Sequence, residues 1–217
     1  MHITLIYACV PLPLLQNAYQ ASKSQIYSHT YQITPEIQNL PFAMQILEHQ
    51  NSYSLMVLGY EDYEDRLSFI DAQERIFTLI EGKAVASFNF DNNLEIKNPP
   101  RIKEIFLKLL KGEIKQFNHE ALIRFTNPET SYLKLESHYI IEDKQNNFFK
   151  RRIDGKELAY YIFKERFYVP QIFWQGENIY WLTEDGEVLK SKQMLFPSKP
   201  KYFFETLKMY TKPRPKS

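Results

Sequence analysis

Short apolar runs separated by polar, turn-forming residues dominate the chain from residue 42 onward. Runs of this length, rich in β-branched and aromatic residues and bounded by Asn, Asp or Gly, are typical of β-strands. Turns are predicted at residues 49–51, 81–83, 146–147, 176–177 and 185–186, with Gly82 able to take a positive φ at no steric cost. The predicted strands are 42–47, 54–59, 67–70, 75–80, 84–90, 121–125, 132–141, 148–153, 158–169, 171–175, 178–183 and 187–195.

Helical spacing is confined to a few segments. Apolar residues recur at three- and four-residue spacing after Pro99-Pro100, and Gly112 follows them, which predicts a helix over about 100–111. We expect this helix to lie across one face of the sheet and cover it. A second amphipathic helix is predicted over 12–27, and Thr34-Pro35 predicts a short helical turn. Residues 202–210 fit either a strand or a helix.

These elements predict a mainly β fold. Antiparallel meander sheets are expected to curl into a sandwich or half-barrel, with an N-terminal helix and the one covering helix. Aromatic residues make up 15% of the chain, including 15 Tyr and 16 Phe, and such side chains fit the pleated surface of a sheet. For 217 residues we expect a single β-rich domain over 12–210, with two meander lobes (about 30–98 and 118–210) as the alternative.

The charge balance argues against nucleic acid as a partner. Lys and Arg total 27 against 26 Asp and Glu, whereas phosphate binding needs a concentrated basic surface. The local basic stretches are residues 150–152 and the end of the chain. Both are interpreted as solvated, and residues 211–217 as a basic disordered tail.

The N-terminal segment carries a candidate lipid-attachment site. The apolar stretch 3–15 is too short to span a bilayer, which takes about 20 residues. Ile6 lies three residues before Cys9 and Ala8 directly before it, as at the end of a lipoprotein signal, but no Lys or Arg precedes them. We expect residues 1–11 to be the remnant of a signal and anchor whose true start lies upstream, with the lipid on Cys9. The alternative is that Cys9 is a buried small hydrophobe.

Candidate chemistry is sparse elsewhere. Cys9 is the sole cysteine, so an intramolecular disulfide and a multi-cysteine zinc site are excluded, and the histidines are scattered without ligand spacing. The acidic run 61–65 lacks the pattern of a calcium loop and is interpreted as a solvated turn, rather than a Ca²⁺ site or an acid/base pair. No nucleophile elbow, phosphate loop or dinucleotide fingerprint is present, so no cofactor is expected.

Aromatic residues cluster near residues 173–181 and suggest contact with sugars. Trp174, Tyr180 and Trp181 are candidates for stacking on the apolar faces of a glycan. Because side chains alternate along a strand, at most half of the cluster that these residues form with Phe173 can face one ligand. The alternative, that the cluster packs in the core, is favoured.

Three segments resemble the YjbF family of group 4 capsule lipoproteins. They are IQNLPFAM (37–44) leading to LMVLGY (55–60); LSFI (67–70) through IFTL (76–79) and GKAV (82–85) to NL (93–94); and IYWLTEDGEVLKSKQ (179–193). The third departs from most relatives, which carry Asp-Pro before the turn. Their order and spacing hold over roughly 12–210.

The resemblance implies an outer-membrane lipoprotein facing the periplasm, tethered through Cys9, that assists capsule or exopolysaccharide production or export without catalysis. Expected partners are the membrane, polysaccharide and other envelope export proteins. It supplies no catalytic residues. The alternative function is a periplasmic carbohydrate-active enzyme that uses a carboxylate pair.

Overall fold

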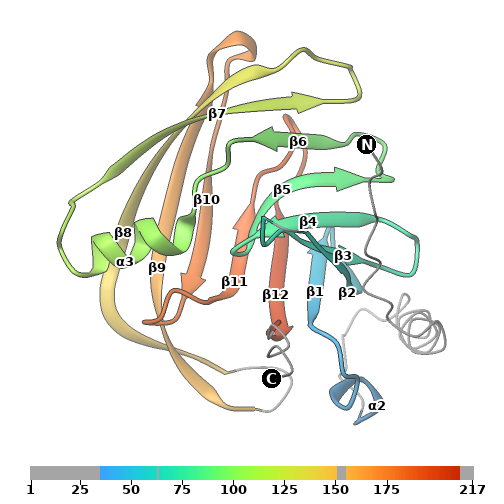
Figure 1. Ribbon diagram of the computed structural model, residues 1–217, viewed down its shortest axis with the longest axis vertical. Coiled ribbons are helices and arrows are strands. Elements are labelled where there is room, and N and C mark those ends of the chain that lie inside the picture. Colours follow the sequence, from blue (N-terminus) through green and yellow to red (C-terminus); the bar gives the residue numbers. More distant parts are fainter. Residues whose placement is uncertain (1–34, 63, 151–154, 211–217) are drawn as a thin grey trace, which may run out of the picture.

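The computed structural model describes residues 35–62, 64–150 and 155–210 (Figure 1). The helix predicted over 12–27, Cys9 and the tail 211–217 lie outside these residues. Two short helical segments, α2 (Pro35–Gln38) and the 3₁₀ turn η1 (Pro170–Ile172), accompany the longer helix α3 (Ile102–Leu110). The strands are β1 (Met44–His49), β2 (Ser52–Glu61), β3 (Leu67–Ile70), β4 (Ile76–Ile80), β5 (Lys83–Phe88), β6 (Leu94–Lys97), β7 (Phe117–Phe125), β8 (Leu133–Lys150), β9 (Glu157–Val169), β10 (Trp174–Leu182), β11 (Val188–Gln193) and β12 (Tyr202–Lys208).

The strands form one closed antiparallel barrel. Each strand pairs with its neighbours in sequence, and β12 returns to pair with β1, for example through Ile46 and Glu205. The predicted antiparallel, mainly β class is therefore confirmed. The closed barrel is a more specific architecture than the predicted sandwich or half-barrel. Closure gives every strand two neighbouring strands, although the β8–β9 hairpin extends beyond the pairing of β8 with β7 and of β9 with β10.

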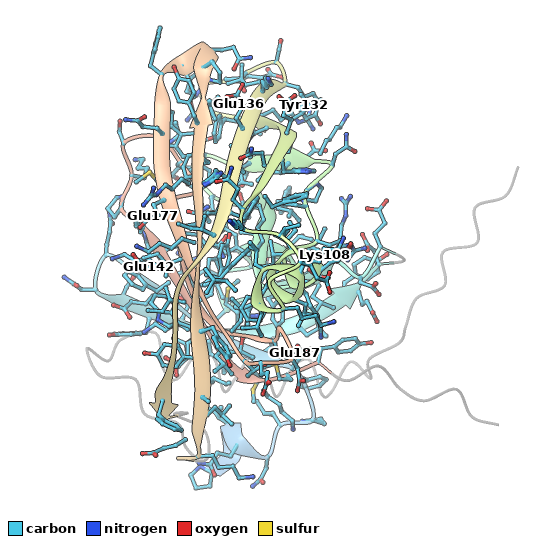
Figure 2. All side chains as sticks on the ribbon, turned by 90° about the vertical axis from the view of Figure 1, so that its left-hand side faces the viewer. Lys108, Tyr132, Glu136, Glu142, Glu177 and Glu187 are labelled. Carbon is cyan, nitrogen blue, oxygen red and sulfur yellow. The ribbon has the colours of Figure 1, made fainter. Side chains whose placement is uncertain are left out.

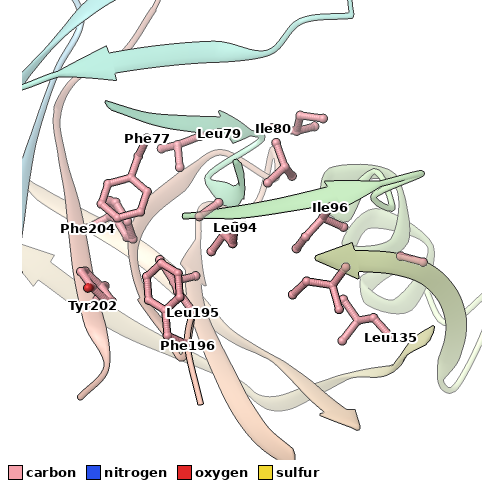
Figure 3. Close-up of a cluster of buried hydrophobic side chains, with 14 of the residues drawn as sticks. Phe77, Leu79, Ile80, Leu94, Ile96, Leu135, Leu195, Phe196, Tyr202 and Phe204 are labelled. Carbon is pink, nitrogen blue, oxygen red and sulfur yellow. The ribbon is translucent and has the colours of Figure 1, made fainter. Parts of the chain in front are cut away.

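The barrel is flattened into two layers. In Figure 1, β8 to β12 and β1 run steeply, whereas β4 to β7 cross in front of them. The space between the layers is filled by buried apolar side chains, including Phe77, Leu94, Ile96, Leu135 and Phe204 (Figure 3). The interior is therefore a packed core.

Tight turns confirm several of the predicted hairpins. Gln50 and Asn51 both have positive φ (50° and 63°) between β1 and β2, as expected of a two-residue hairpin turn. Gly82 has φ 80° between β4 and β5, and a Cβ there would lie 2.7 Å from the Cβ of Val188. Glycine is needed at position 82 for both the backbone conformation and the close contact.

Two of the predicted turns are wrong. Strand β8 continues through Asn146-Asn147, and β10 continues through Gly176-Glu177. The chain turns at η1 and Phe173 and not at the predicted residues 176–177. A strand was expected over 171–175, but Pro170 opens a 3₁₀ turn there. Gly176 serves close packing: a Cβ there would lie 2.7 Å from both Phe167 Cζ and Met194 Sδ. Glycine within a strand can mark such an approach rather than a turn.

Other boundaries also differ from expectation. The four-residue strand β6 was not predicted, and β7 begins at Phe117 instead of Ala121. The ambiguous segment 202–210 contains strand β12, which ends at Lys208. In each case the residues pair with neighbouring strands, and such pairing can recruit residues that carry little local strand signal.

Helix α3 covers the inner face of the sheet at one end of the barrel. Its apolar side places Ile105 and Phe106 against Tyr139, Phe163 and Tyr180 of β8, β9 and β10. After the helix, Gly112 has φ 74° and its N–H donates to the Leu109 carbonyl. The predicted covering helix is therefore confirmed. Within the described residues, no helix is both long and apolar enough to cross a bilayer.

Candidate functional site: a buried carboxylate and an acidic pocket

A buried ion pair joins the two layers of the barrel. Lys83 begins β5 and Glu165 lies in the middle of β9, and both side chains point inward with 3% and 1% of their surface exposed. The Lys83 ammonium donates to both Glu165 carboxylate oxygens, at 2.5 and 2.6 Å. Such charges are rarely buried unless they are paired and hydrogen-bonded.

Four further donors surround the same carboxylate. Ser137 and Tyr139 donate to Oε1, each at 2.8 Å, and Asn178 and Tyr180 donate to Oε2 at 3.0 and 2.9 Å. Burial alone would raise the pKa of Glu165, but the Lys83 charge and these hydrogen bonds lower the pKa to about 2. The carboxylate is therefore ionised and fully surrounded by donors.

The tyrosines around Glu165 stay protonated. Burial, followed by the nearby Glu165 charge, raises the pKa of Tyr139 and of Tyr180 well above the ordinary value. Each hydroxyl therefore remains a donor to the carboxylate. Both oxygens of the buried Glu165 are occupied by donors from β5, β8 and β10, so Glu165 joins these strands to β9 and keeps no free acceptor for a substrate.

A second polar network extends this cluster toward β11. The Gln193 amide nitrogen donates to the Gly82 carbonyl and to Ser191 Oγ, both at 2.8 Å. The backbone N–H of Ala84 donates to Gln193 Oε1 at 2.9 Å. Gln193 therefore holds the β4–β5 turn against β11.

Sequence reasoning missed the Glu165 cluster. Lys83 and Glu165 lie far apart in the sequence, and no spacing rule connects them. A weak signal was present: Glu165 alternates with Phe163 and Phe167, so period-two patterning places it on an apolar face. A charged residue in that position needs a buried partner, but only the fold identifies the partner as Lys83.

A pocket of about 470 Å³ lies at the end of the barrel where β2, β4 and β12 finish and α3 begins. Glu61, Asp65, Glu81 and Glu187 supply carboxylates to its lining, against the ammonium groups of Lys103 and Lys208. We call it the acidic pocket. Its remaining lining includes the polar side chains of Gln45 and Thr206 and the apolar side chains of Leu67, Phe69, Leu79 and Val188.

The carboxylates of the acidic pocket also hold the surrounding elements in place. Glu81 Oε2 accepts the Lys103 N–H at the start of α3 at 2.8 Å, where a negative charge is favoured by the helix dipole. Burial raises the pKa of Glu81. Glu187 pairs with the Lys103 ammonium at 2.5 Å on the surface (Figure 2), and Glu61 accepts from the Tyr210 hydroxyl.

The acidic run that contributes Glu61 and Asp65 connects β2 to β3. Asp62 Oδ1 accepts the N–H of Glu64 and of Arg66, at 2.8 and 3.0 Å, which is a local turn of the kind Asp favours. Arg66 also pairs with the Glu64 carboxylate. Across the described part of the chain, no three His, Cys, Asp or Glu side chains gather as a metal site.

The opposite end of the barrel has a smaller pocket, of about 230 Å³, with a different character. Arg75 lines it and is held by two donor contacts to Asp71 Oδ2, at 2.6 and 2.8 Å. His49 stacks on Tyr202 with ring centroids 4.0 Å apart, and its pKa is lowered, chiefly by burial. The two ends of the barrel therefore differ in charge.

The aromatic candidates for glycan stacking are separated by the fold. Trp174 is buried in the core, 4.7 Å from Phe167 between ring centroids, and Tyr180 is fully buried beside Glu165. Neither ring presents a face to solvent, because both point into the barrel. Trp181 is half-buried on the outer side with the Lys190 ammonium 5.9 Å from its ring centroid. Glycan stacking stays a prediction, for which Trp181 is the accessible ring.

Comparison with known proteins identifies a solved structure with a similar fold and a matching family. No curated protein matches the sequence. The chain is similar in structure to the hypothetical lipoprotein YmcC from Escherichia coli (K12), with a TM-score of 0.69 and 16% identity over 91% of this chain and 96% of that one. At that identity the likeness shows a shared fold. The family described as "Group 4 capsule polysaccharide lipoprotein gfcB, YjbF" matches residues 22–207. This match spans most of the chain and confirms the resemblance, so the chain belongs to the YjbF family.

Proposed function

We propose that this protein is an outer-membrane lipoprotein that faces the periplasm and assists the production or export of a capsule or exopolysaccharide without catalysing a reaction. Its lipid is carried by Cys9. Its partners are the membrane, the polysaccharide and other export proteins. The observation that carries this proposal is membership of a family described as capsule polysaccharide lipoproteins, over residues 22–207.

The chemistry of the interior supports a non-catalytic role. The most strongly perturbed carboxyl, that of Glu165, is enclosed and surrounded by five donor groups. Catalytic acids and bases must reach a substrate proton, which this group does not. Its low pKa is accounted for by structure, since ion-pair networks also perturb pKa values.

One observation supports a second candidate function, that of a carbohydrate-active enzyme. The acidic pocket brings several carboxylates to one cavity, and burial raises the pKa of Glu81, as a general acid would require. Against it, one Glu81 oxygen already accepts the backbone N–H at the start of α3.

Two measurements test the proposal. Deletion of the gene should reduce surface polysaccharide, and the wild-type gene should restore it, whereas Cys9→Ser should fractionate away from the outer membrane and restore little. Unchanged polysaccharide in the deletion strain would remove the proposed role.

The non-catalytic part is tested separately with purified protein and the isolated polysaccharide. We expect no release of reducing ends. Release that disappears in Glu81→Gln, with folding retained, would establish the enzyme instead.

A further inference from the structure

We propose that the acidic pocket binds one segment of the polysaccharide, at sugars that carry free hydroxyl or ammonium groups and no acidic substituent. This inference rests on the proposed function and names the chemical class of its ligand. The pocket volume of about 470 Å³ falls within the range of roughly 300–1,000 Å³ that is typical of ligand sites.

A buried, unpartnered acceptor lines this pocket. Gln45 projects from β1 on the same side as Leu47, toward the interior, and only 7% of its surface is exposed. Its Oε1 is buried and has no hydrogen-bond partner among the described residues. A buried acceptor without a partner destabilises the protein, and a hydrogen-bond donor on a ligand would remove that cost. The matching ligand group is an O–H or N–H.

The charges around Gln45 select the same kind of ligand. The lining has carboxylates from Glu61, Asp65, Glu81 and Glu187 but ammonium groups only from Lys103 and Lys208. Lys103 is paired with Glu187, and Lys208 donates to the Leu40 carbonyl at 2.7 Å. Ionised carboxylates only accept hydrogen bonds, so hydroxyl and ammonium donors fit, whereas a uronate, sulfate or phosphate would be repelled.

The shape of the pocket is set by rigid parts of the fold. The apolar side chains of Phe69, Leu79 and Val188 lie beside the polar groups and offer contact to the C–H faces of a sugar. Two turns, at Gly82 and Gly186, border it, and a Cβ at Gly186 would lie 2.8 Å from Lys103 Cγ. The site therefore exists before any ligand arrives.

The test is a binding titration of the full purified chain with three oligosaccharide probes of equal length. These are a neutral β-glucan, the glucosamine oligomer and an oligogalacturonate. Binding of each probe is measured by calorimetry and by chemical-shift changes. We expect the glucosamine oligomer to bind most tightly, the neutral glucan more weakly and the oligogalacturonate not at all.

Two variants locate the binding. Glu187→Gln removes one carboxylate of the pocket and should weaken glucosamine-oligomer binding by about tenfold or more, since a charge-assisted hydrogen bond or ion contact is lost. Gln45→Leu keeps the size of the side chain, removes its acceptor and should weaken binding of both the neutral and the amino oligomer. Thermal unfolding of each variant confirms that it is folded.

The matched control is Glu142→Gln. Glu142 pairs with Lys164 at 2.5 Å, as Glu187 pairs with Lys103 at 2.5 Å. Figure 2 labels Glu142 and Glu187, which lie well apart. This control should bind like the wild type. Equal loss in Glu142→Gln and Glu187→Gln, equal binding of the acidic oligomer, or no binding of any probe would overturn the inference. Those outcomes are distinct from failure of the proposed function, which is read from surface polysaccharide in the deletion strain.

Discussion

Lys83 and Glu165 come from strands on different layers of the barrel and form a buried ion pair with Nζ–Oε distances of 2.5 and 2.6 Å. The pair therefore connects β5 with β9, which are not neighbours in the sheet. Because Glu165 also accepts from Ser137, Tyr139, Asn178 and Tyr180, it is the most heavily hydrogen-bonded side chain described in this core.

Removing one partner of this pair should destabilise the fold strongly. Glu165→Gln leaves the Lys83 ammonium buried without a counter-charge, and loss of one partner of a buried pair typically costs about 3–5 kcal/mol. The double variant Lys83→Met/Glu165→Gln should recover part of that loss. Urea unfolding is measured for the wild type, for Glu165→Gln and Lys83→Met singly, and for the double variant. Additive effects in this double-mutant cycle would contradict the coupling, and the surface control Glu142→Gln should stay within about 0.5 kcal/mol of wild type.

Stability should fall in acid because of the same residue. The pKa of Glu165 is about 2 in the folded protein against its usual 4.5, so the unfolded chain takes up the proton first as pH falls. The stabilisation is complete above pH 4.5 and is lost between about pH 4.5 and 2, by roughly 3 kcal/mol. Urea unfolding between pH 7 and 2 measures it. In Glu165→Gln the unfolding free energy should depend much less on pH between 4.5 and about 2. A pH dependence identical to that of the wild type would refute the attribution of the acid sensitivity to Glu165.

Two glycines with similar backbone conformations should respond differently to alanine. Gly82 (φ 80°) would place a Cβ 2.7 Å from Val188 Cβ, whereas a Cβ at Gly112 (φ 74°) meets nothing within 4 Å. Gly112→Ala should therefore lose only the cost of the left-handed conformation, about 1–2 kcal/mol, and Gly82→Ala should lose more. Thermal unfolding compares them directly, and equal losses would show that the β4–β5 turn relaxes freely.

Alanine substitution of the two tryptophans should distinguish a role in core packing from a role in glycan binding. Trp174→Ala empties a buried site and should cost about 3–5 kcal/mol, whereas Trp181→Ala on the outer side should cost much less. If Trp181 stacks on glycan, its loss lowers surface polysaccharide while the protein level is unchanged. Both quantities are measured in the complemented deletion strain, by immunoblot and by polysaccharide assay. Normal polysaccharide with Trp181→Ala would end the stacking hypothesis.

Much of the secondary structure could be read from local pattern. The hairpin turns at residues 50–51 and 81–82 and the helix 102–110 all lie where glycine, asparagine and apolar spacing predict them. These features depend on backbone preferences within a few residues, which sequence records directly. The continuation of β8 past Asn146-Asn147 could not be read that way, since pairing with β9 outweighs the local turn preference there.

The amino-acid sequence by itself determined the antiparallel β class, the covering helix and the family. Tertiary structure decided the closure of the barrel through β1 and β12, the union of Lys83 with Glu165, and the gathering of Gln45 with the carboxylates of the acidic pocket. The physical reason is distance along the chain. Local propensity acts between neighbouring residues, whereas buried charges and pockets are completed by side chains that only the folded chain brings together.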